Sequence, residues 1–138
     1  MKQRALLLGV TLAVGIPVGV IGTTVLNAQQ EPMKRAVLLE TVLVGFAGKH
    51  AMVYRVEFAP GASGGKHRHP GDTFVYVLDG TLTLEEEGKG PRTVNAGEVV
   101  QEVPTGIYKT TNTSMTSPVT VLVVSLGEKD QPLSVPVK

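Results

Sequence analysis

Residues 61–80, GASGGKHRHPGDTFVYVLDG, decide the fold and contain two of the chain's three histidines. His67 and His69 are separated by one residue, so on an extended strand both side chains leave the same face, roughly 7 Å apart. Pro70-Gly71 predicts a turn directly after them, and the apolar run 74–78 predicts the next strand. This is how a β-scaffold presents two imidazoles to one metal ion.

Short strands and tight turns extend in both directions from this stretch. Residues 51–58, AMVYRVEF, alternate in a way typical of a half-buried strand, and Asp79-Gly80 between runs 73–78 and 81–85 is typical of a hairpin. Further strands are predicted at 37–44, 91–94, 98–103, 107–112 and 119–126. About nine short strands and no convincing helix after residue 30 predict an all-β fold, either a small sandwich or a barrel.

The composition agrees with a single β-rich domain. Of the 138 residues, 42% are hydrophobic, which is enough for a core, and 16 glycines with 9 prolines favour tight turns. The chain contains no cysteine, which excludes disulfides and thiolate chemistry. No basic stripe is present, so we expect no nucleic-acid partner.

The N-terminus predicts a targeting segment over residues 1–30. Met1 to Arg4 is positive, and residues 5–30 carry no charge, as in a secretory signal. The uncharged run is longer than a typical signal core and near the length that spans a bilayer. A cleaved signal predicts a periplasmic or secreted protein, whereas a retained segment predicts a membrane anchor. Membrane contact is expected only through this segment. Without residues 1–30 the net charge changes from +1 to −1.

The histidine stretch resembles the first motif of the cupin superfamily. That motif is a glycine, five residues, His-x-His, a glutamate a few residues later and a closing glycine. Gly61, His67, His69 and Gly80 match it, and the glutamate position falls on Thr73.

Residues 97–112 resemble the second cupin motif. Gly97, Pro104, Gly106 and Asn112 match, and Tyr108 occupies the histidine position, with Lys109 as the alternative. The resemblance covers about residues 36–136 and is closest to small, single-domain, exported cupins (cupin type 2-like) with a degenerate metal motif. It implies a cupin domain over 36–136, a double-stranded β-helix (jelly roll) that is usually a dimer.

The resemblance also implies a divalent transition metal, one of Fe, Mn, Ni, Zn or Cu. The candidate ligands are His67, His69, Thr73 and Tyr108. A hydroxyl is a weak ligand, and tyrosine binds iron only when its phenol, with a pKa near 10, loses its proton. Asp72 precedes Thr73, but on a regular strand it turns away from the site. We therefore expect a weak site with no charged oxygen.

Two functions follow from these observations. The first is an exported β-barrel with a degraded metal site that holds a small apolar or aromatic ligand in its interior. The second is a metal-dependent enzyme of the dioxygenase or isomerase kind that uses His67, His69 and an oxygen ligand. Both faces of the strand 73–78 are apolar, so its outer face needs a cover, either the N-terminal strand or a second subunit in a homodimer.

Overall fold

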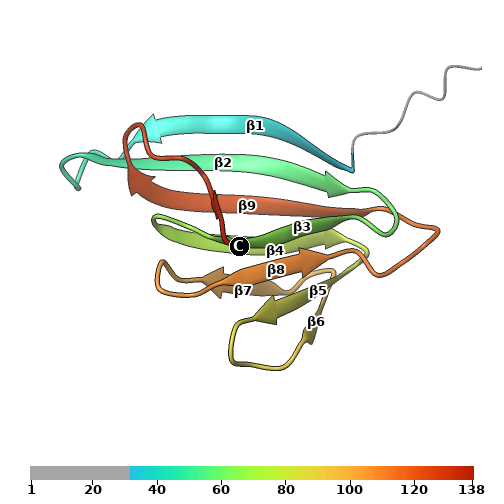
Figure 1. Cartoon of the computed structure of the whole chain (residues 1–138). Helices are drawn as coiled ribbons and strands as arrows, with labels where there is room; N and C mark the ends of the chain where they lie inside the picture. The colour runs from blue at the N-terminus through green and yellow to red at the C-terminus, as the bar shows by residue number, and fades with distance from the viewer. Residues whose placement is uncertain (1–31) are drawn as a thin grey trace, which may run out of the picture.

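The computed structural model describes residues 32–138, which form two antiparallel sheets of five strands each (Figure 1). The strands are β1 (Met33–Val42), β2 (Lys49–Phe58), β3 (Ser63–Arg68), β4 (Asp72–Asp79), β5 (Thr81–Glu86), β6 (Arg92–Asn95), β7 (Val99–Glu102), β8 (Tyr108–Thr111), β9 (Val119–Glu128) and β10 (Val135–Pro136). The larger sheet has the order β1-β2-β9-β4-β7, and the second sheet has the order β10-β3-β8-β5-β6.

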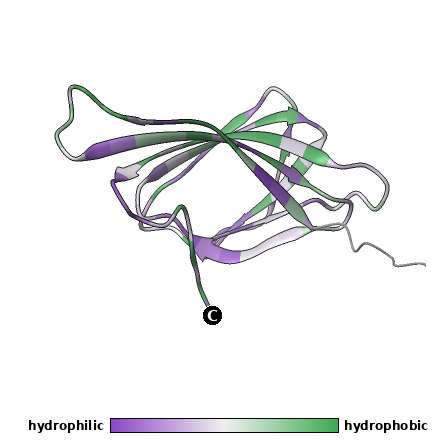
Figure 2. Cartoon of the chain, turned by 90° about the horizontal axis from the view of Figure 1, so that it is seen from above, coloured by the Kyte–Doolittle hydropathy of each residue, from purple (hydrophilic) through white to green (hydrophobic). Residues whose placement is uncertain are grey.

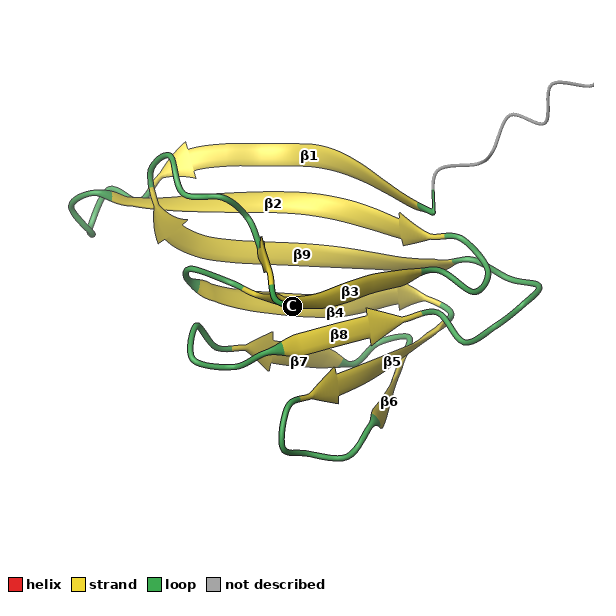
Figure 3. Cartoon of the chain, viewed as in Figure 1, coloured by secondary structure: helices red, strands yellow, loops and turns green. Residues whose placement is uncertain are grey.

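The predicted all-β class is confirmed. Residues 32–138 contain strands, turns and loops, and no helix is drawn among them (Figure 3). Accordingly, this part of the chain has no helix long and apolar enough to cross a membrane. The predicted signal or anchor at residues 1–30 lies outside the described residues.

The core lies between the two sheets and follows from the alternation of side chains along the strands. On β9, Val119, Val121 and Val123 point inward, and on β2 their partners Phe58, Val56 and Tyr54 do the same. The second sheet contributes mainly Leu82, Leu84, Val94 and Tyr108. Figure 2 shows the strands curving around this common interior. Burying the apolar face of each sheet against the other is the main source of stability in such an architecture.

The predicted strand boundaries are correct to within a few residues over most of the chain, with two differences. β1 runs from Met33 to Val42, although residues 37–44 were expected. Its polar first residues pair with the end of β2, and an edge strand that is exposed along its whole length tolerates them. β10 was not predicted, because two residues that pair with β3 leave no periodic pattern.

The turn after the histidines is fixed by close backbone packing. A Cβ added to Gly71 would lie 1.8 Å from the carbonyl oxygen of Leu126 on β9, so only glycine fits this position. This contact holds the turn between β3 and β4 against the larger sheet, and it thereby positions the histidine pair at the end of β3.

Candidate metal centre

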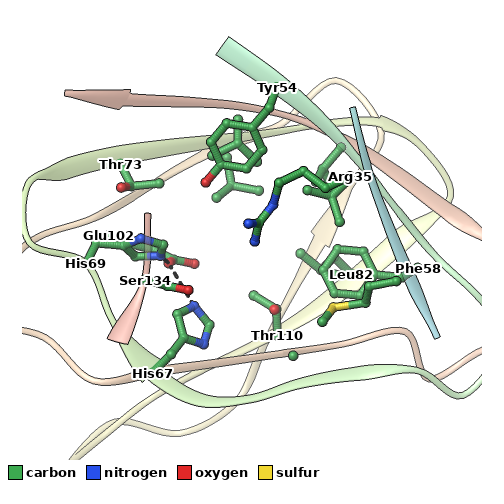
Figure 4. Close-up of a pocket in the computed structure, with 16 residues that line it drawn as sticks. Arg35, Tyr54, Phe58, His67, His69, Thr73, Leu82, Glu102, Thr110 and Ser134 are labelled. Atoms are coloured by element: carbon green, nitrogen blue, oxygen red, sulfur yellow. Dashed lines mark ion pairs between the residues drawn. The ribbon is translucent and has the colours of Figure 1, made fainter. Parts of the chain in front are cut away.

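The two histidines meet edge to face at the end of β3. His67 lies on β3 and His69 follows it directly, with ring centroids 5.0 Å apart and an interplanar angle of 89°. His69 is buried, and His67 keeps 13% of its side chain exposed. The predicted placement of both rings on one side of the strand is confirmed (Figure 4).

Backbone carbonyls orient both imidazoles. Nδ1 of His67 lies 3.0 Å from the carbonyl oxygen of Gly65, and Nδ1 of His69 lies 2.6 Å from that of Leu133. A carbonyl can only accept, so we assign the ring proton to Nδ1 in each case. Each Nε2 is then left with a lone pair, which is the arrangement that metal-binding histidines adopt.

A buried carboxylate completes the cluster. Glu102 ends β7 and lies opposite Thr73 of β4 in the ladder, with only 1% of its surface exposed. Its Oε2 lies 2.7 Å from Nε2 of His69 and 3.6 Å from Nε2 of His67. One ligand atom from each of the three residues lies within 4.8 Å of the others. Two imidazoles and one carboxylate form a donor set that suits Fe, Mn, Zn or Cu.

The three ligand atoms can share either a proton or a metal ion, because each of them can act as an acceptor. Neither carboxylate oxygen of Glu102 receives a well-directed hydrogen bond from residues 32–138, although Oε2 is in contact with Nε2 of His69. Two lone pairs at this distance repel unless a proton or a metal ion lies between them. The residues present therefore fit a divalent metal ion.

The same arrangement explains the pKa shifts of the metal-free protein. Burial of the His67 ring acts to lower its pKa, but contacts with Glu102 and the Gly65 carbonyl outweigh burial and raise the pKa above 6.5. Burial of Glu102 acts to raise its pKa, but the two imidazoles outweigh burial and lower the pKa below 4.5. These opposite shifts favour a charged His67 imidazole beside a charged Glu102 carboxylate when no metal is bound.

The structure separates the two hydroxyl residues that were predicted as ligands. Thr73 is fully buried and lines the same cavity as the histidines, and its Oγ1 lies 3.4 Å from Oγ of Ser125. Tyr108 lies opposite His67 in the β3–β8 ladder, but it does not line this cavity. Its hydroxyl accepts a hydrogen bond of 2.9 Å from the amide of Val103 and packs over Gly106.

The other two candidates have partners elsewhere. Lys109 forms an ion pair with Glu85 at 3.2 Å. Asp72 accepts a hydrogen bond of 3.0 Å from the side chain of Gln101 and turns away from the cavity, as expected for the neighbour of Thr73 on a strand.

The expectation that the site lacks a charged oxygen is wrong, because Glu102 supplies one. Sequence reasoning missed this residue because it lies on a different strand from the histidines. One signal was available: Glu102 shares the inward parity of Val100 on a short strand that ends before Pro104. A carboxylate at a buried parity is rarely tolerated without a charged partner.

A cavity of about 90 Å³ lies beside the cluster. Apolar and polar side chains both line it, and Figure 4 shows Phe58 and Leu82 across the cavity from His69 and Glu102. The apolar part includes Val56, Phe58, Val75, Leu82, Val121 and Val123, and the polar part includes Arg35, Tyr54, Thr110 and Ser134. This volume holds several water molecules or a small ligand.

An antiparallel two-sheet barrel with two histidines and a carboxylate at its interior belongs to the class of β-barrels with an internal candidate metal site. A family model described as "Cupin domain" matches residues 54–125, and the chain therefore belongs to the cupin family. No curated protein matches the chain.

Solved structures support the fold. A cupin-like protein from Thermotoga maritima is 24% identical with a TM-score of 0.62, covering 76% of this chain and 75% of that protein. KdgF from a Halomonas species is 21% identical with a TM-score of 0.59, and the match covers 72% and 82%. The DMSP lyase DddQ from Ruegeria pomeroyi is 23% identical with a TM-score of 0.56 over 63% of this chain. The match spans only 43% of the lyase. At these identities the comparisons establish the double-stranded β-helix alone.

Proposed function

We propose that this protein is a metal-binding cupin that holds a small ligand beside one divalent transition metal ion. His67, His69 and Glu102 would hold the metal. The observation that carries the proposal is the convergence of one ligand atom from each of these three residues within 4.8 Å in a largely buried site. A bound ion of this kind would act as a Lewis acid toward a ligand in the adjoining cavity.

Metal titration of the purified protein tests the proposal. We expect one Co²⁺, Mn²⁺ or Zn²⁺ per chain by calorimetry, and loss of this binding in His67→Ala and His69→Ala. His50→Ala is the matched control, because His50 lies outside the cluster and its nearest carboxylate is Glu40 at 3.8 Å. Metal binding that is the same in all three variants would rule out the site.

A metal-dependent enzyme is the second candidate function. It is favoured by the number of protein ligands, because three ligands leave open positions at the ion, whereas structural sites usually have four. The visible spectrum of the Co²⁺-loaded protein distinguishes the two. A spectrum that changes when azide is added indicates an exchangeable position, whereas an unchanged spectrum contradicts catalysis at the metal.

We propose further that the chain is exported through residues 1–30, which carry a positive start and a long uncharged run. The folded domain would then be periplasmic or secreted, or anchored to the membrane if the segment is retained. The mass of the protein recovered from the producing cell tests this. A chain that keeps Met1 and is found in the cytoplasm would contradict export.

A homodimer is proposed from the outer face of the larger sheet. Two rows of neighbouring side chains cross all five strands of this sheet. One row is Leu39, Val53, Val124, Phe74 and Gln101, and the other is Ala36, Arg55, Leu122, Tyr76 and Val99. Eight of these ten residues are apolar, and Tyr76 and Val99 are 40% and 59% exposed. A second copy of this face would cover it.

Sedimentation tests the dimer. We expect twice the chain mass for the unmodified protein and a monomer for Val99→Lys, which adds a charge to an exposed apolar position within the proposed contact. Lys89→Ala, on an exposed turn of the other sheet, is the control. A monomeric mass for the unmodified protein would contradict the proposal.

A further inference from the structure

Arg35 is an exposed cation that lines the cavity beside the candidate metal centre and forms no ion pair among residues 32–138. Arg35 lies on β1 opposite Val56, and both residues line the cavity. Figure 4 shows the guanidinium directed into the cavity from β1, beside the ring of Tyr54. Within the described part of the chain, no carboxylate lies within 4.0 Å of Arg35.

The position of Arg35 is fixed by an aromatic contact. Its Cζ lies 5.2 Å from the centroid of the Tyr54 ring, within the range of a cation–π interaction. This contact holds the guanidinium over the cavity without neutralising its charge. The N–H donors of the guanidinium therefore remain available to a ligand.

The cavity also contains hydroxyl groups that no hydrogen bond occupies. Within residues 32–138, the hydroxyls of Tyr54, Thr110 and Ser134 have no hydrogen-bond partner in the protein, and all three residues line the cavity. Burial raises the pKa of Tyr54 to about 12, and the nearby charges of Arg35 and Glu102 act in opposite directions on it. The phenol therefore stays protonated and can donate a hydrogen bond.

The charges in the cavity favour an anion. Among the described residues that line the cavity, Glu102 is the single acid, and Arg35 balances its charge. A divalent ion held by His67, His69 and Glu102 would give the cavity a net positive charge, and the cavity is partly shielded from water. Such a space attracts a negatively charged ligand.

We propose that the cavity binds a small carboxylate, with Arg35 as the residue that pairs with the carboxylate. This inference rests on the proposed metal site, which supplies the excess positive charge. A planar guanidinium and a carboxylate match in a bidentate pair, and a lone arginine suits a monoanion. The apolar wall formed by Val56, Phe58 and Leu82 would contact the hydrocarbon part of the ligand. The volume of about 90 Å³ restricts the ligand to a few heavy atoms.

Binding of propionate to the Co²⁺-loaded full-length protein tests the inference, with propionamide as the neutral isostere and inorganic phosphate as a competing anion. We expect saturable propionate binding by calorimetry, at least about tenfold tighter than propionamide. Arg35→Gln should lower the propionate affinity by at least about tenfold and leave the Co²⁺ affinity unchanged. Arg35→Lys should retain part of the propionate affinity, because lysine keeps the positive charge but cannot form the bidentate hydrogen bonds of a guanidinium.

Arg55→Gln is the matched control, because Arg55 lies on the outer face of the same sheet opposite Ala36. Equal affinity for propionate and propionamide, an unchanged affinity in Arg35→Gln, or tighter binding of phosphate would overturn the inference while the metal site stands. If Co²⁺ does not bind, that result contradicts the proposed metal site without deciding whether the cavity binds a carboxylate. Propionate binding to the metal-free protein that depends on Arg35 then supports the carboxylate site, and its absence overturns it.

Discussion

Nε2 of His69 lies 2.7 Å from Oε2 of Glu102, across the space between the end of β3 and the end of β7. The two residues come from different sheets, so the contact exists only after both sheets have closed over the core. Binding of a metal ion at this site would therefore be coupled to folding, because an ion that binds only the folded state raises its stability.

Glu102→Gln keeps the shape of the side chain and removes the charged ligand. We expect the affinity for Co²⁺ to fall by at least about 100-fold, because loss of a ligand exceeds the effect of removing a hydrogen-bond partner of a ligand. Glu57→Gln, on a strand of the larger sheet outside the cluster, should leave the affinity unchanged. Competition with a coloured chelator measures both values, and equal affinities would contradict the assignment of Glu102.

Metal affinity should decrease as the pH falls. The pKa of His67 is raised above 6.5, so a proton competes with the metal ion for Nε2 at a higher pH than for an unperturbed imidazole. Calorimetric titrations of Co²⁺ at several pH values should show proton release on binding and a steady loss of affinity below that pKa. An affinity independent of pH between 8 and 6 would contradict direct ligation by His67.

The folding stability of the metal-free protein should also depend on pH, and it should fall at high pH, where metal affinity is greatest. The stabilisation from the raised pKa of His67 is complete below pH 6.5 and is lost as the pH rises through that pKa. The stabilisation from the lowered pKa of Glu102 is complete above pH 4.5 and is lost as the pH falls through that pKa. The contribution of this pair is therefore largest between pH 4.5 and 6.5. Denaturant titrations at several pH values measure this contribution as the difference in free energy of unfolding between the unmodified metal-free protein and His67→Gln.

Gly71→Ala should destabilise the protein by about 3 kcal/mol or more, because its Cβ would overlap backbone atoms of β9 that cannot move independently. Gly90→Ala is the control, since a Cβ there meets nothing within 4 Å and the backbone is not left-handed. Its effect should stay within about 0.5 kcal/mol. Urea denaturation compares the two, and similar midpoints would contradict the close approach at Gly71.

Asn112→Ala should cost about 3 kcal/mol, because it leaves several buried backbone groups without a partner. The Asn112 side chain is fully buried, donates to the carbonyls of Phe58, Ala59 and Ser117, and accepts from the amide of Ser114. Asn95→Ala is the exposed control. We expect a clearly lower Tm for Asn112→Ala alone and unchanged metal binding in both variants. A loss of metal affinity without a loss of stability would contradict a purely structural role.

The sequence predicted features that depend on local periodicity. Alternation on the strand after Pro70 placed Thr73 and Val75 inward and Phe74 and Tyr76 outward, and the structure confirms this placement. The spacing of His67 and His69 likewise fixed the direction of both rings. Neither result needs knowledge of the strand order.

Features that depend on long-range pairing were not predictable from periodicity. Glu102 becomes a candidate ligand because β7 pairs with β4 beside Thr73, and this register is set by the whole sheet. Arg35 reaches the cavity because the pairing of β1 with β2 begins at Met33, four residues before the apolar run 37–44. Tyr108 was expected at the metal because it stands at the motif's histidine position, but its ring turns over Gly106 instead.

The hydrogen bond between His69 and the carbonyl of Leu133 would give the C-terminus a role in metal binding at the proposed site. Residues 133–137 run alongside β3, where the amide of Val137 donates to the carbonyl of Lys66. Because this segment holds the Leu133 carbonyl in place, it determines which nitrogen of His69 faces the carboxylate of Glu102. Removing these last residues would delete no ligand, yet it would free the His69 ring to exchange tautomers and rotate. A shortened chain could therefore keep every coordinating residue and still lose selectivity for one ion over another.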